Sequence, residues 1–194
     1  MSSLSENPMP DPAESLRREL EEAFRNRAHL YRLLLDELEA EIGPDRAEAV
    51  LARALDRRGR EIAAVLFRDC PPDPESVAER FLSVSPDGGR MYPHEVERRD
   101  GAVTIRVRRC PLKDAWMEAG LPSGRVAALC RLAGVFDRGL FEAAGLSFAN
   151  RTWTEARGGG CCWITLARAG TTVARPGAES KVARAARRDA LPRR

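Results

Sequence analysis

The sequence predicts a single α+β domain, with a helical N-terminal half followed by β-hairpins that are interrupted by helices. Apolar residues recur at helical spacing through most of residues 12–66. After residue 95 the pattern changes, and apolar and polar residues alternate as they do along strands. The 194 residues suffice for one hydrophobic core, and no internal repeat is visible. We therefore expect one domain over residues 11–170.

The N-terminal half predicts three helices with clear start and stop signals. Asp11-Pro12 is typical of a helix start, and Gly43-Pro44 ends the pattern that follows. A second helical pattern runs on to Cys70, where two prolines follow, and Gly59 should loosen its middle. Pro74 begins a short third helix. Two long helices and a short one are therefore expected before the first strand.

The second half predicts two hairpins around a helical insertion. Residues 96–110 alternate on both sides of an Asp-Gly turn, which is typical of a β-hairpin. Helices should then begin at Pro111 and at a capping Ser123. A last hairpin is expected over residues 147–169, joined through the glycines at 158–160. Strands and helices thus mix in this half.

The composition is that of a globular protein, with 43% hydrophobic and 31% charged residues. No apolar run could span a bilayer, and the first residues do not resemble a secretion signal, so a cytoplasmic location and no membrane partner are expected. Residues 1–10 are expected to be disordered. Residues 171–194 hold seven basic and two acidic residues but no aromatic one, which predicts a disordered basic tail and no nucleic-acid partner.

Three of the five cysteines hold positions that suit chemistry. Cys110 lies where a strand ends and a helix begins, and a helix N-terminus lowers a thiol pKa, so it is the best nucleophile candidate. Cys130 lies on the apolar stripe of a helix. Cys162 shares a strand face with aliphatic residues and should point inward, which puts Cys161 on the opposite face beside Trp163. Taken singly, each thiol is better explained by packing in the hydrophobic core, because free cysteine is among the most buried residue types.

Metal binding is a second interpretation of the same thiols. The chain lacks a CxxC or HExxH motif, but Cys110, Cys130 and Cys162 could meet in space and hold zinc or an iron–sulfur cluster. A thiol mechanism would need no cofactor. Asp137 follows Cys130 by seven residues, or two helical turns, and could act beside it as a base, although Gly134 could interrupt that helix.

Three stretches carry a family resemblance: RRCPLKDAWMEAGL, LCRLAGVFDRGLF and RTWTEARGGGCCWI. Together they resemble the bacterial L-2-amino-thiazoline-4-carboxylic acid hydrolase family over roughly residues 103–166. The chain departs from the pattern at Gly159, where an acidic residue is expected, and in the extra thiol of Cys161. The resemblance implies Cys110, Cys130, Asp137 and Cys162 as catalytic residues and Trp116, Gly120 and Gly158 as further motif positions, of which Trp116 and Gly158 would bind substrate.

The function that this resemblance implies is hydrolysis of a C–N bond, cyclic amidine-like or amide, in a small substrate derived from an amino acid. The alternative is a small-molecule or metal-binding module without turnover, because cysteine-framed α+β domains such as the 4-vinyl reductase domain look broadly similar. A protein-interaction role would leave the cysteines unexplained. The residues leave open the substrate, the nucleophile and the oligomeric state.

Overall fold

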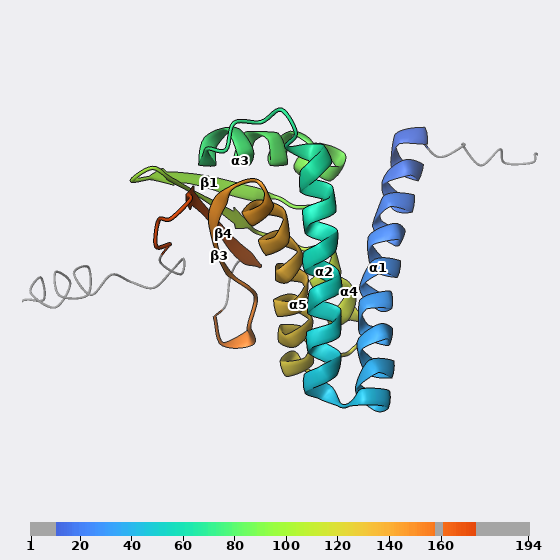
Figure 1. The fold of residues 1–194 in the computed structure, drawn as a ribbon. Coiled ribbons are helices and arrows are strands. Elements are labelled where there is room, and N and C mark those ends of the chain that lie inside the picture. Colours follow the sequence, from blue (N-terminus) through green and yellow to red (C-terminus); the bar gives the residue numbers. More distant parts are fainter. Residues whose placement is uncertain (1–10, 158–160, 174–194) are drawn as a thin grey trace, which may run out of the picture.

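The computed structural model describes residues 11–157 and 161–173, which form five α-helices and a four-stranded antiparallel sheet (Figure 1). The α+β class is confirmed. The expected disorder of residues 1–10, and of the tail from residue 174 on, lies outside the described residues. The elements are α1 (Pro12–Ile42), α2 (Pro44–Leu66), α3 (Pro74–Ser83), β1 (His94–Arg99), β2 (Ala102–Val107), α4 (Pro111–Glu118), α5 (Ser123–Ala143), β3 (Leu146–Arg151) and β4 (Cys162–Arg168), with short 3₁₀ turns at Pro86–Gly89 and Glu155–Arg157.

The two expected hairpins join into one sheet with the strand order β1-β2-β4-β3. Strand β4 pairs with β3 and also with β2, so Ile105 lies opposite Ile164 and Val107 opposite Cys162. One face of the sheet buries Ile105 and Leu166 in the core. On the other face the Trp163 ring lies between the guanidinium groups of Arg106 and Arg151, 5.3 and 3.9 Å from its centroid.

Helices α2 and α5 pack closely along much of their length, with α1 on the far side of α2 (Figure 1). Their backbones touch at two glycines. A Cβ atom on Gly59 would overlap with the carbonyl oxygen of Phe136, and one on Gly139 would overlap with that of Asp56. Gly59 therefore does not loosen α2. With Gly139, it permits the backbones of α2 and α5 to approach closely.

Helix α5 differs from its expected form at two points. It runs without a break through Gly134, where the absent side chain leaves room for Asn150, whose amide donates to the Gly134 carbonyl at 3.2 Å. Ser123 is the first residue of the helix and not its cap; Pro122 precedes it and no side chain caps the end. The unbroken helix keeps Cys130 and Asp137 in a fixed relation.

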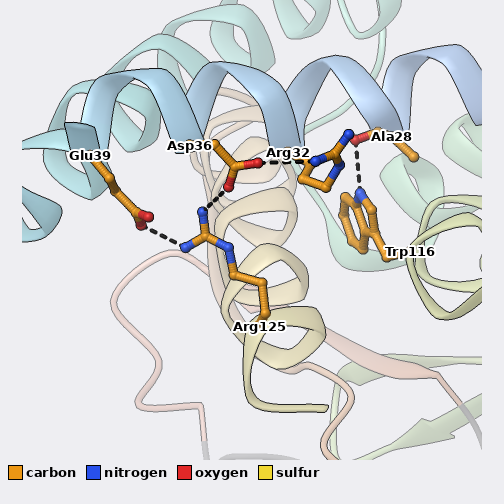
Figure 2. Close-up of polar contacts among 6 residues, drawn as sticks. All are labelled: Ala28, Arg32, Asp36, Glu39, Trp116 and Arg125. Carbon is orange, nitrogen blue, oxygen red and sulfur yellow. Dashed lines mark hydrogen bonds and ion pairs between the residues drawn. The ribbon is translucent and has the colours of Figure 1, made fainter. Parts of the chain in front are cut away.

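Ion pairs fasten the start of α5 to α1. Arg125 donates to Asp36 at 2.5 Å and to Glu39 at 2.6 Å, and Asp36 also accepts from Arg32 at 3.1 Å (Figure 2). All four side chains are about one quarter to two fifths exposed. Such half-exposed pairs add little stability one by one, but a guanidinium shared by two carboxylates fixes the orientation of both helices.

Candidate active site

A cavity of about 310 Å³ lies where the two hydrophobic core clusters of the domain meet. Its walls come from all five helices, from all four strands and from the loops that follow α3 and flank β1, β2 and β3. Most of the lining is aliphatic or aromatic. The polar or reactive side chains on it are few: Arg27, Tyr31, Ser85, Tyr92, His94, Cys110, Cys130, Asp137, Asn150, Thr152 and Cys162. A volume of this size can take a small organic ligand.

The structure brings most of the sequence-derived candidates to this one cavity. Cys110, Cys130, Asp137 and Cys162 all line it, and Trp116 borders it. Gly158 lies outside the described residues. Cys70 and Cys161 are not among the lining residues. Thiols from the α4 N-terminus, α5 and β4 therefore converge with one carboxylate.

Cys110 is the N-cap of α4, as its position in the sequence suggests. The backbone N–H groups of Leu112 and Lys113 favour its thiolate, but a hydrogen bond with the Cys161 thiol and burial outweigh them. The pKa of Cys110 is therefore well above its usual value. The expected low pKa is wrong for this structure, because the hydrogen bond with Cys161 and the partial burial of the thiol outweigh the effect of the helix end.

Cys161 does not lie on the outer sheet face beside Trp163. Strand β4 begins only at Cys162, so strand alternation does not extend to Cys161. Its backbone N–H donates to the Val107 carbonyl at 2.7 Å, and its side chain is 1% exposed in the core, next to Cys110. Of these two adjacent cysteines, Cys161 lies in the core, and Cys162 lines the cavity together with Ile164.

Cys130 is 6% exposed, and burial followed by the charge of Cys110 raises its pKa to about 12. A neutral thiol is therefore its resting form at physiological pH. Within the described part of the chain, no group of three or more His, Cys, Asp or Glu residues is placed to hold a metal ion. The three cavity thiols accordingly do not form a ready zinc or iron–sulfur site.

Asp137 is the cavity residue whose pKa best suits proton transfer at neutral pH. It lies on α5, two turns after Cys130, and burial raises its pKa from 3.8 to about 7. No hydrogen bond or ion pair to its carboxyl group is found within the described segments. A carboxyl group that is half ionised near neutral pH can both accept and donate a proton, as a general acid–base catalyst must.

Trp116 supports the cavity wall from behind. It has no accessible surface, and its indole N–H donates to the carbonyl of Ala28 on α1 at 2.8 Å (Figure 2). The indole therefore fixes α4 to α1 and has no donor left for a ligand. This arrangement favours an indirect role, through wall shape, for the residue that the sequence suggests as substrate-binding.

Sequence reasoning missed the polar groups that α1 and the loop before β1 bring to the cavity. Arg27 and Tyr31 lie one turn apart on α1, and Tyr92 precedes β1. Burial raises the pKa of both tyrosines, and both lie within reach of the charges of Arg27 and Asp137. The i, i+4 spacing of Arg27 and Tyr31 is visible in the sequence, but only the packing of α1 against α2 and α4 places both side chains on the cavity.

The comparisons with known proteins agree with the resemblance noted above. The family model described as L-2-amino-thiazoline-4-carboxylic acid hydrolase matches residues 23–165, which include the described cavity residues. A search of curated proteins found no match to this chain. None of the helices within the described ranges has the length and apolarity that crossing a membrane requires.

Proposed function

Because the chain belongs to the L-2-amino-thiazoline-4-carboxylic acid hydrolase family, we propose that it hydrolyses a C–N bond of a small cyclic amidine-like or amide substrate bound in this cavity. The observation that carries the proposal is Asp137, whose carboxyl group has a pKa of about 7 and no partner among residues 11–157 and 161–173, on a cavity that also holds three thiols. This combination supplies proton transfer at neutral pH beside groups that can position or attack an electrophilic carbon.

In the proposed reaction, water adds to the carbon of the C=N group. Asp137 takes one proton from the water as the new C–O bond forms. That proton passes to the ring nitrogen and leaves a hydroxyl group on the tetrahedral carbon. Asp137 then carries the hydroxyl proton to the same nitrogen as its bond to the carbon breaks, so that water contributes its oxygen to the carbonyl and both hydrogens to the released amine. Cys110, Cys130 and Cys162 surround the reacting carbon in this scheme, and Arg27 is placed to bind an anionic substituent.

A covalent route through Cys110 would need one further proton transfer. The resting thiol is neutral, so Asp137 would have to accept the thiol proton as sulfur attacks the carbon. Water would then release the product from the thioester-like intermediate. Cys110→Ser separates the two routes: near-complete loss of turnover supports the covalent one, and retained turnover supports direct attack by water.

The test uses the purified full chain and 2-amino-thiazoline-4-carboxylate together with simpler cyclic amidines, with release of the ring-opened product as the readout. Asp137→Asn should lower the rate by at least about 100-fold, the usual contribution of a general acid–base catalyst. Glu142→Gln, an exposed change on the same helix, should leave it unchanged. Equal rates for Asp137→Asn and the unmodified protein would contradict the assignment.

A second candidate, binding of a small molecule without turnover, is favoured by one observation. The cavity is mostly apolar, and the pKa values of Cys110 and Cys130 are raised, which suits a ligand pocket better than a store of thiolates. Saturable binding of a cyclic amidine that the protein returns chemically unchanged would support this candidate.

A further inference from the structure

One wall of the cavity is apolar, and its side chains take no part in the proposed hydrolysis of a C=N group. Helices α2 and α3 contribute only large apolar side chains to the described lining: Ile62, Leu66, Phe81 and Leu82. We call these four residues the α2–α3 wall. Phe81 is held edge-on against Phe141 at 5.0 Å, so this part of the wall is packed firmly from behind.

The ionisable groups enter from other elements. Arg27 and Tyr31 belong to α1, Asp137 to α5 and Cys162 to β4. These ionisable side chains therefore come from α1, α5 and β4, whereas the residues of the α2–α3 wall come from α2 and α3. A ligand that complements this lining has a polar part and a separate apolar part.

The size of the cavity leads to the same conclusion. The compound in the family's name is a five-membered ring with one amino and one carboxyl group. A cavity of about 310 Å³ is at the lower end of the roughly 300–1,000 Å³ of sites that enclose drug-sized ligands. The small ring alone would leave the α2–α3 wall without a partner and would gain nothing from it.

Building on the proposed function, we propose that the substrate of this chain is a cyclic amidine-type acid with a branched alkyl or aryl substituent. The C=N ring lies at Asp137 and the substituent lies against the α2–α3 wall. Apolar burial then supplies binding free energy away from the reacting carbon, where it can orient the ring. Specificity for the substituent resides in α2 and α3.

The test measures binding separately from turnover. The probes are 2-amino-thiazoline-4-carboxylate and its analogues with methyl, isopropyl or phenyl on the ring carbon beside sulfur. They are titrated calorimetrically into Asp137→Asn, whose neutral amide resembles the protonated carboxyl group, and turnover is assayed with the unmodified protein. Affinity should rise about fourfold for each carbon that becomes buried, since a buried methylene contributes about 0.8 kcal/mol. Isopropyl and phenyl analogues should therefore bind more than tenfold tighter than the parent.

Matched variants locate the effect on the wall. Leu66→Ala should reduce the preference for isopropyl over the parent at least threefold, whereas Val65→Ala, at the neighbouring 70% exposed position outside the cavity lining, should preserve it. Phe81→Leu tests the same wall if Leu66→Ala unfolds below the assay temperature. Substituents that give no gain in affinity, or a gain that both wall variants retain, would overturn the inference.

The outcomes also separate this inference from the proposed function. Tighter binding of substituted rings without turnover of any probe would support the preference of the α2–α3 wall for a substituent and refute the proposed hydrolysis. Turnover of the parent ring together with no gain from the substituents would do the reverse.

Discussion

Replacing Asp137 by asparagine should change how the stability of the protein depends on pH. Burial raises the pKa of this carboxyl group from 3.8 to about 7. Between these values the folded protein keeps a proton that the unfolded chain has lost, so its free energy of unfolding falls as pH rises. One pKa unit corresponds to about 1.4 kcal/mol, and the span therefore corresponds to at most about 4 kcal/mol. Asp137 keeps some accessible surface, and this exposure to solvent reduces the figure.

Asparagine has nearly the same shape and does not ionise. Near pH 4 the variant and the unmodified protein should have similar free energies of unfolding, since both carry a neutral side chain. At pH 8 the variant should be more stable by about 2–4 kcal/mol. Urea unfolding at half-unit steps from pH 4 to pH 8 measures the free energy of unfolding of both proteins. In the difference between the two, the titration of all other groups cancels.

Glu142→Gln is the control, because this exposed residue on the same helix forms only a surface ion pair with Arg60 at 3.5 Å. It should change the free energy of unfolding by less than about 1 kcal/mol at any pH. If the curve of the unmodified protein runs parallel to that of Asp137→Asn over the whole range, the carboxyl group is not desolvated as described. Its proposed role in proton transfer would then lose its basis.

Three further substitutions test the packing and the thiols. Gly139→Ala should destabilise by about 1–3 kcal/mol because the new methyl group meets the α2 backbone, whereas Gly124→Ala, in open space on the same helix, should be neutral or stabilising; thermal melts decide. Trp116→Phe removes the hydrogen bond to α1 and should cost about 1–3 kcal/mol in urea unfolding. Cys161→Ala removes the main cause of the raised pKa of Cys110, so alkylation of Cys110 at pH 8, followed by mass spectrometry, should become faster; an unchanged rate would contradict the thiol–thiol contact.

Much of the fold could be predicted because its signals are local. Asp11 and Asp73 precede prolines, and both accept backbone hydrogen bonds at helix starts as their positions suggest. The positive φ at Asp100 and Gly101 matches the turn that the sequence predicts. The union of two hairpins into one sheet could not be foreseen, because the pairing of β2 with β4 joins segments about 60 residues apart. Such pairing depends on how the helices between them pack.

The glycines show the limit of local reasoning most clearly. In isolation Gly59 and Gly134 weaken a helix, and propensity alone predicts a loosened or broken one. In the fold each allows another segment to approach the helix backbone, an effect that depends on tertiary contacts. For the site, sequence reasoning brought together three thiols and a carboxylate from distant positions, but the direction in which the pKa of Cys110 shifts depends on burial and on Cys161.

Helices α2 and α5 contact each other through backbone atoms at two glycines, and this contact affects how the ligand specificity of the protein could change. Gly59 and Gly139 set the separation of the two helices, whichever side chains stand nearby. Ile62 and Leu66 follow one crossing point on α2, and Asp137 precedes the other on α5. Wall residues can therefore be exchanged, by evolution or by an engineer, without altering the distance across which a bound molecule must fit. Variation in ligand choice can accumulate on α2 while the position of the reactive carboxyl group stays constant.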